Sequence, residues 1–83
     1  MVIFSKSYCP YCTTTKQLFQ SKNINAKVIE LNQIDNGDEV QGALMVMSGQ
    51  RTVPNVFIKG KHLGGNDDTQ AAARSGKLEE MLA

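Results

Sequence analysis

The run Val-Ile-Phe-Ser-Lys-Ser-Tyr-Cys-Pro-Tyr-Cys, residues 2–12, decides how we expect this chain to fold. Its first three residues form a short apolar stretch bounded by serine, which is typical of a buried strand. Pro10 suits the first turn of a helix, because the N–H that proline lacks would have no partner there. We expect that helix to run to about Lys22. The run therefore predicts a strand, a short loop and a helix, with a Cys-x-x-Cys pair where the helix begins.

The position of the two cysteines has a chemical consequence. The nucleophile in disulfide exchange is the thiolate, and a free cysteine with a pKa of about 8.5 is mostly protonated at neutral pH. Unpaired N–H groups at a helix start favour an anion, and Lys6 lies three residues before Cys9 to add positive charge. Cys12 lies one turn further on, close enough to form a disulfide with Cys9. We therefore predict that Cys9 attacks and that Cys12 is the resolving thiol.

A cysteine pair can also have other uses. Two buried structural cysteines are one alternative. Zinc is disfavoured, because a closed zinc site needs four ligands and the chain offers only Cys9, Cys12 and a single histidine, His62. A metallochaperone would also place a Cys-x-x-Cys on a loop before a helix, so the motif alone does not exclude that class.

The rest of the chain alternates strands and helices. We expect Asn36 to cap a second helix, with Glu39 three residues later, and Gly49 to end it. Gly76 should interrupt the last helix. The expected segments after the first helix are a strand at 26–31, a helix from 36 to 49, strands at 56–58 and 62–63, and a helix from 66. The order β-α-β-α-β-β-α favours a parallel first pair and an antiparallel last pair. The fold class is therefore α/β, with a four-stranded mixed sheet flanked by helices.

Two further motifs lie between these elements. Thr52-Val53-Pro54 precedes a strand, where proline is tolerated, and we predict a cis Val53–Pro54 bond that leaves the Val53 peptide groups free to pair with an extended peptide. In Gly64-Gly65-Asn66-Asp67-Asp68, the glycines permit close backbone approach. The helix N–H groups that follow can hold a carboxylate, and the aspartates can hold an ammonium. An ordinary strand-entry proline and an ordinary turn with an N-cap remain the alternatives.

Length and composition limit the classes of protein. The 83 residues suffice for one domain, residues 1–83, and the formal net charge is only +1. The basic residues are scattered, so we expect no nucleic-acid partner, and no apolar run is long enough to span a membrane. The two cysteines fit a reducing compartment, and no secretory signal is visible. We expect a cytoplasmic protein, or an organellar one if a leader has been removed.

Taken together, these motifs resemble the glutaredoxin family, in its dithiol class with a Cys-Pro-Tyr-Cys active site. The resemblance runs from about Val2 to Leu82. The matching residues are Lys6, Cys9-Pro10-Tyr11-Cys12, Gln41, Gln50-Arg51-Thr52-Val53-Pro54 and Gly64-Gly65-Asn66-Asp67-Asp68. Thioredoxin itself fits less well, because its family pattern has Trp before Cys-Gly-Pro-Cys and this chain has no Trp.

The resemblance implies a thioredoxin-like fold and a glutathione-dependent disulfide oxidoreductase. Glutathione would be the co-substrate, and no metal is expected. The protein partners would be glutathionylated and disulfide-bearing proteins, and the protein itself would be a monomer. The resemblance also implies a glutathione site. In it, Lys6 and Gln41 would hold the glycyl carboxylate, and Tyr11 would line the groove. The cysteinyl backbone would pair with Thr52, Val53 and Pro54, and the γ-glutamyl end would be held by Asn66, Asp67 and Asp68. A rival reading is an iron–sulfur carrier, in which Cys9 and glutathione from two chains ligate a cluster.

Overall fold

The computed structural model describes residues 1–83, which form four strands, four α-helices and one 3₁₀ helix. In chain order they are β1 (Val2–Ser5), α1 (Pro10–Ser21), β2 (Lys27–Glu30), η1 (Leu31–Gln33), α2 (Gly37–Ser48), β3 (Asn55–Ile58), β4 (Lys61–Gly64), α3 (Asn66–Ser75) and α4 (Lys77–Leu82). The predicted order is confirmed. The second strand is shorter than expected, because Leu31 already begins η1.

The four strands form one mixed sheet in the order β2-β1-β3-β4. β1 and β2 are parallel, with Val2 opposite Lys27. β3 runs antiparallel to both of its neighbours, β1 and β4. This confirms the predicted parallel first pair and antiparallel last pair. Because β1 lies inside the sheet, the loop that follows it and carries Cys9 starts from a strand that is paired on both sides.

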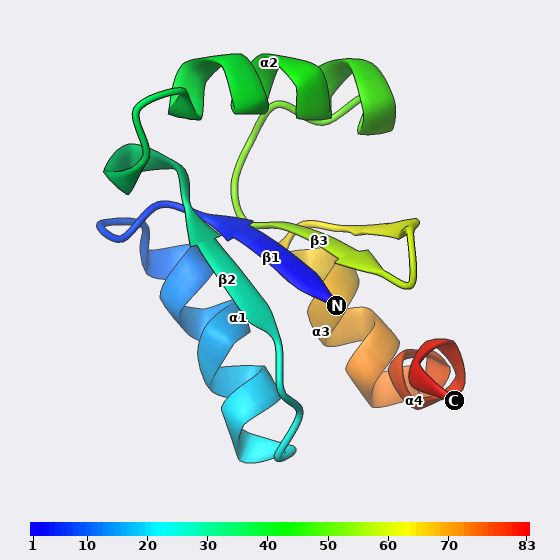
Figure 1. Cartoon of the computed structure of the whole chain (residues 1–83). Helices are drawn as coiled ribbons and strands as arrows, with labels where there is room; N and C mark the ends of the chain where they lie inside the picture. Colours follow the sequence, from blue (N-terminus) through cyan, green and yellow to red (C-terminus); the bar gives the residue numbers. More distant parts are fainter.

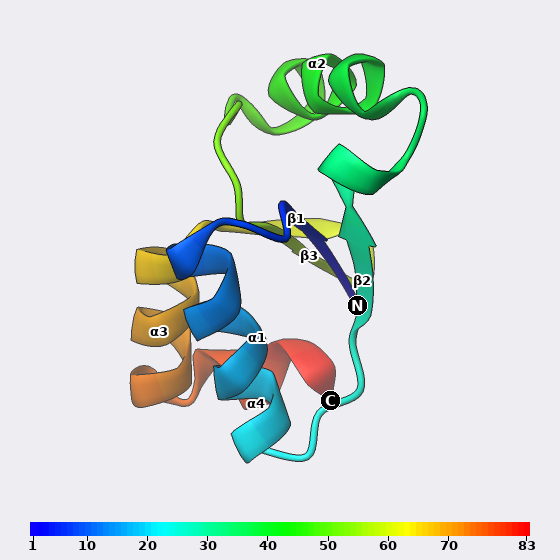
Figure 2. The ribbon, with the colours of Figure 1, turned by 90° about the vertical axis from the view of Figure 1, so that its left-hand side faces the viewer.

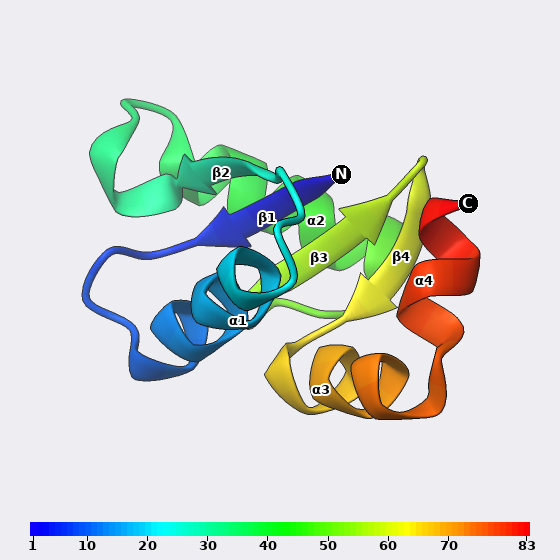
Figure 3. The same cartoon turned by 90° about the horizontal axis from the view of Figure 1, so that it is seen from below.

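The helices are divided unequally between the two faces of the sheet (Figures 1 and 2). α2 lies alone over one face, whereas α1, α3 and α4 cover the other. Seen from that second side, α1 and α3 lie next to each other (Figure 3), and the two helices are in contact. The start of α1 and the start of α3 are therefore held on the same side of the sheet.

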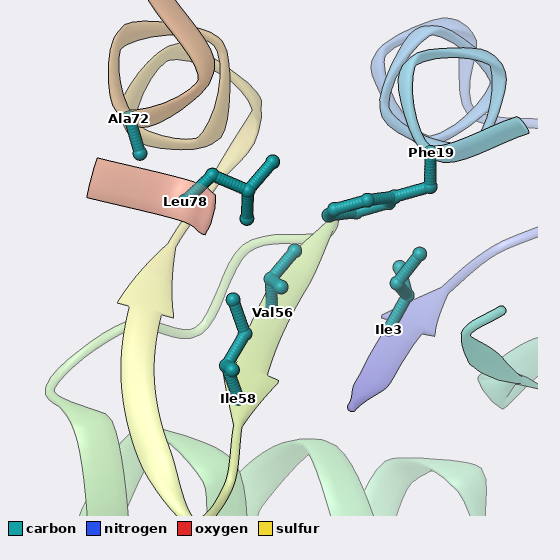
Figure 4. Packing of buried hydrophobic residues seen from close by; sticks show 6 residues of the cluster. All are labelled: Ile3, Phe19, Val56, Ile58, Ala72 and Leu78. Atoms are coloured by element: carbon teal, nitrogen blue, oxygen red, sulfur yellow. The ribbon is translucent and has the colours of Figure 1, made fainter. Parts of the chain in front are cut away.

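The main hydrophobic core fills the space between the sheet and α1, α3 and α4 (Figure 4). Its members are Ile3, Phe19, Val56, Ile58, Ala72 and Leu78, each at most 4% exposed. On α1 the buried residues are Cys12, Thr15 and Phe19, which recur at helical spacing on one face. Packing therefore fixes the rotation of α1, and with it the side on which each cysteine lies.

The ends of α2 test the capping predictions. Gly49 ends the helix in a left-handed conformation (φ +75°), as expected. Asn36 is the N-cap residue, as predicted, but its side chain accepts no hydrogen bond from the helix. Packing on η1 decides this helix start instead: a Cβ on Gly37 would lie 1.9 Å from the Leu31 carbonyl oxygen. Only glycine allows η1 and α2 to approach so closely.

The space between α2 and the sheet is less tightly filled. An apolar cavity of about 440 Å³ lies there, lined in part by Phe4, Leu44, Met47 and Phe57. None of the helices is long and apolar enough to cross a membrane.

Candidate active site

Cys9 is the N-cap residue of α1. Its backbone is extended (φ −89°, ψ 119°), and its sulfur accepts a hydrogen bond from the Cys12 N–H at 3.4 Å. The N–H of Cys9 donates to the Lys6 carbonyl at 3.0 Å, which fixes the loop before the helix. The half-exposed sulfur thus occupies the position where a helix start best stabilises negative charge.

The surroundings of Cys9 lower the pKa of its thiol. Partial burial opposes ionisation, but hydrogen bonds from Cys12 and Tyr11 and the charge of Lys16 outweigh it. Lys6 was expected to supply the positive charge, whereas in the structure the contribution comes from Lys16. Lys16 lies two helical turns after Cys9, but that spacing alone does not show that its side chain acts on the thiol. Its ammonium also pairs with Glu30 at 2.9 Å.

Cys12 has the opposite environment. Its side chain is completely buried, and burial together with the neighbouring Cys9 raises the pKa of its thiol. Both cysteines are free thiols in this structure. The pair is therefore divided chemically: Cys9 is the accessible group that ionises more easily, and Cys12 is the protonated group behind it.

A cavity of about 430 Å³ opens beside Cys9. Three segments form it: the first turn of α1, the loop before β3, and the junction of β4 with α3. The cavity is lined by Tyr11, Gln50, Thr52, Val53, Pro54, Gly65, Asn66, Asp67 and Asp68. The Cys9 sulfur contacts the Val53 carbonyl oxygen at 3.8 Å, which places the thiol at the rim of this cavity.

The loop before β3 presents one peptide unit to the cavity. The Val53–Pro54 bond is cis, as predicted. The N–H of Val53 makes no hydrogen bond within the chain, and its carbonyl oxygen accepts only the weak contact from Cys9. Val53 thus offers a donor and an acceptor beside the reactive sulfur, which is the pattern that an extended peptide requires.

The start of α3 provides charge and unpaired donors. The N–H groups of residues 66–68 have no partner within the chain, as is usual in a first helical turn. Asp67 and Asp68 are exposed beside them. Asn66 is partly engaged elsewhere, because its side-chain oxygen accepts from the Thr15 hydroxyl at 2.9 Å and so ties α3 to α1. This end of the cavity can therefore bind an anionic and a cationic group together.

Gly64 allows the Asp68 side chain to lie against the chain at the end of β4. Its φ is +129°, and a Cβ there would lie 2.3 Å from the Asp68 Oδ2. The Asp68 carboxylate therefore occupies the space that any other residue at position 64 would fill.

The structure brings together most of the residues expected in a glutathione site, though not all of them. Seven line the cavity: Tyr11, Thr52, Val53, Pro54, Asn66, Asp67 and Asp68. Lys6 and Gln41 do not line it, and the Gln41 amide instead donates to the Arg51 carbonyl at 2.7 Å. Gln50 and Gly65 line the cavity without having been assigned a role, although both belong to the motifs on which the resemblance rests. His, Cys, Asp and Glu side chains do not gather in threes as a metal-binding group.

Comparison with known proteins agrees with this geometry. The family model described as Glutaredoxin matches residues 1–63. The chain belongs to the glutaredoxin family. Two rice (Oryza sativa subsp. japonica) glutaredoxins are similar over 99% of this chain. Glutaredoxin-C6 is 52% identical with 73% of its own length covered, and glutaredoxin-C8 is 54% identical with 62% covered. The chain thus spans roughly two thirds to three quarters of these glutaredoxins.

Solved structures show the same fold. A buckwheat glutaredoxin in complex with glutathione superimposes with a TM-score of 0.95 at 52% identity, over 98% of this chain and 74% of that one. The holo form of glutaredoxin C1 from Populus tremula x tremuloides gives a TM-score of 0.94 at 42% identity, over 98% of this chain and 80% of that one. The predicted thioredoxin-like fold is therefore confirmed.

Proposed function

We propose that this glutaredoxin is a glutathione-dependent thiol–disulfide oxidoreductase that reduces protein–glutathione mixed disulfides and some protein disulfides. One observation carries the proposal. The ionisable thiol of Cys9 borders a cavity with two sets of binding groups. One is the unpaired peptide unit of Val53, and the other is the start of α3, with its unpaired N–H groups and two carboxylates. Those are the groups needed to hold a γ-glutamyl tripeptide with its sulfur next to Cys9.

Glutathione carries groups that match each part of the cavity. Its cysteinyl backbone would pair with the N–H and C=O of Val53, beside Thr52 and Pro54. Its γ-glutamyl carboxylate would accept from the free N–H groups at the start of α3, and its ammonium would face Asp67 and Asp68. The buckwheat relative crystallised with glutathione supports this assignment.

The remaining contacts belong to the other end of the tripeptide. Lys6 and Gln41 would hold the glycyl carboxylate, and Tyr11, which is 66% exposed, would lie along the groove. Because Lys6 and Gln41 lie outside the cavity lining, these two contacts depend on how far the tripeptide extends beyond it.

The reaction then proceeds in two exchanges. The Cys9 thiolate attacks the glutathione sulfur of a mixed disulfide, a new disulfide forms between Cys9 and glutathione, and the protein thiolate leaves and takes up a proton. A second glutathione, as its thiolate, attacks the glutathione sulfur held on Cys9. Oxidised glutathione leaves, and the Cys9 thiolate is regenerated.

Cys12 takes no part in that cycle. It is required when Cys9 is joined to a protein partner and an internal thiol must displace that partner. The buried, protonated state of Cys12 favours this delayed role, because an ionised second thiol would compete for every intermediate. We further propose that the protein acts as a monomer in a reducing compartment such as the cytoplasm.

Turnover of a mixed disulfide between glutathione and a small thiol tests the proposal. Cys9→Ser should abolish all activity. Cys12→Ser should keep or increase deglutathionylation while losing much of the reduction of protein disulfides. If a folded Cys12→Ser protein were as inactive as Cys9→Ser on the mixed disulfide, Cys9 could not be the sole nucleophile. Brown protein with visible absorption after anaerobic purification, without turnover, would favour the cluster carrier.

A further inference from the structure

Gln50 holds the loop on both sides of Val53. Its side-chain amide nitrogen donates to the Thr52 carbonyl and to the Pro54 carbonyl, each at 3.0 Å. Both partners are acceptors only, so the nitrogen of the amide must face them. One side chain thereby occupies the carbonyl groups immediately before and after Val53 and leaves the Val53 peptide groups as the unpaired ones.

The backbone of Gln50 is also held by hydrogen bonds, and these fix the point from which its side chain extends. Its N–H donates to the Ser48 hydroxyl at 3.2 Å. That hydroxyl donates to the Leu44 carbonyl at 2.7 Å and accepts from the amide of the buried Asn55 at 3.3 Å. The end of α2 and the start of β3 are thus joined through Ser48.

The same amide also lies against the third wall of the cavity. A Cβ built on Gly65 would lie 3.5 Å from the Pro54 carbonyl oxygen and 3.7 Å from the Gln50 amide nitrogen. The junction between β4 and α3 therefore passes close to the Gln50–Pro54 pair, with room for no more than a methyl group between them.

From these contacts we propose that Gln50 is a positioning residue for the disulfide substrate. It sets the orientation of the Val53 peptide unit and the spacing between that unit and the start of α3, and so controls how well a γ-glutamyl peptide is aligned. It acts through Val53 and leaves the ionisation of Cys9 unchanged. This inference rests on the proposed function.

The test uses two variants of matched size. Gln50→Met keeps the length of the side chain but has no donor, and Gln50→Glu keeps its shape but at neutral pH only accepts. Gln20→Met is the control, because Gln20 is exposed near the far end of α1 from Cys9. With a mixed disulfide of glutathione and 2-mercaptoethanol, both Gln50 variants should raise KM about five- to tenfold, the factor expected for one hydrogen bond. In Gln50→Met, which adds no charge, the turnover number and the midpoint of Cys9 thiolate absorbance against pH should stay as in the wild type.

The outcomes separate this inference from the proposed function. If the wild type turns over the mixed disulfide and KM is unchanged in folded Gln50 variants, the positioning role is wrong and the function stands. If KM stays and only the thiolate midpoint moves, Gln50 acts on Cys9 and the role is also wrong. If the wild type shows no turnover, the proposed function fails first.

A second measurement needs no variant and covers the case in which the Gln50 proteins do not fold. In the wild-type protein, the Gln50 side-chain amide protons should exchange with solvent at least several-fold more slowly than those of the exposed Gln20. Addition of glutathione should slow exchange at the Val53 N–H. Equal exchange rates for the two glutamine side chains would overturn the proposal.

Discussion

Gly64→Ala should damage both the stability of the fold and the binding end of the active site. Gly64 ends β4 and has a φ of +129°, which residues with a Cβ rarely adopt. It also lies directly under Asp68, one of the two carboxylates in the cavity. A single methyl group is therefore expected to act on the backbone and on a substrate-binding side chain together.

The size of the effect follows from the contacts. Holding an alanine at this φ costs about 1–3 kcal/mol. The new Cβ would lie 2.3 Å from the Asp68 Oδ2 and 2.9 Å from its Cβ and Cγ, distances at which atoms must move. Overpacking of that kind costs about another 1–3 kcal/mol. We expect a total loss of about 2–6 kcal/mol in the free energy of unfolding, much of the stability of a small domain.

Urea and thermal denaturation followed by circular dichroism measure this loss. At roughly 4–8 °C per kcal/mol for a domain of this size, Tm should fall by at least about 8 °C. Gly42→Ala is the matched control, because Gly42 lies inside α2 with no atom within 4 Å of a built Cβ. That change should leave stability the same or raise it by roughly 0.5–1 kcal/mol, since alanine is the better helix former.

A double variant shows whether Asp68 is the reason. Asp68→Ala removes the carboxylate and leaves only the Cβ contact at 2.9 Å. Gly64→Ala should therefore cost about 1 kcal/mol less in the Asp68→Ala background than in the wild type. A Gly64→Ala protein as stable as the wild type would refute the steric argument, and equal costs in both backgrounds would show that the Asp68 carboxylate is not the source of the strain.

Three other predictions concern charge. Lys16→Met removes a charge that lowers the pKa of Cys9, so the thiolate midpoint and the pH profile of kcat/KM should both move to higher pH; no movement would exclude Lys16 as a contributor. Asp68→Asn should raise KM for the mixed disulfide about two- to fivefold, less at high salt, whereas Asp38→Asn, in the first turn of α2, should not; equal KM values would remove Asp68 from the site. Burial opposes ionisation of Glu30, but the nearby Ser5 hydroxyl and the Lys16 ammonium, which donates to the Glu30 carboxylate at 2.9 Å, lower its pKa. Ionised Glu30 therefore stabilises the fold fully above its pKa in the unfolded chain, and this contribution is lost as the pH falls through its lower pKa in the folded protein. In Glu30→Gln the free energy of unfolding should therefore decrease less steeply with falling pH, as measured by urea denaturation at a series of pH values.

The sequence predicted the fold well because the determining signals are local. Strand and helix order, the stops at Gly49 and Gly76, and the buried α1 face all follow from short patterns that tertiary contacts did not override. Two features at the start of α2 were not predicted: the 3₁₀ helix η1, and an N-cap at Asn36 without a side-chain hydrogen bond. Gly37 packs onto the Leu31 carbonyl, a contact between η1 and α2 that no local pattern encodes.

The sequence predicted most of the residues that form the site, but only part of the contacts they make. Cys9 at a helix start, and the motifs around Val53 and Asp68, could be read from residue order. That Lys16 is the charge acting on Cys9 could not, because the direction in which each lysine side chain points depends on packing and on its pairing with Glu30. The same holds for Gln50, whose role depends on two carbonyl groups that become close only when the loop is folded.

The two ends of the cavity have different functions, thiol chemistry at Cys9 and substrate binding at the start of α3, and the structure of each end explains the difference. The Cys9 end is the start of a helix that packs on the core and follows a central strand. The other end is a helix start held to α1 by Asn66 and Thr15. The Val53 loop lies between them, outside both helices, and its carbonyl groups are held by side chains. Substitutions in that loop should therefore change substrate alignment more than thiol reactivity, and substitutions along α1 should do the reverse.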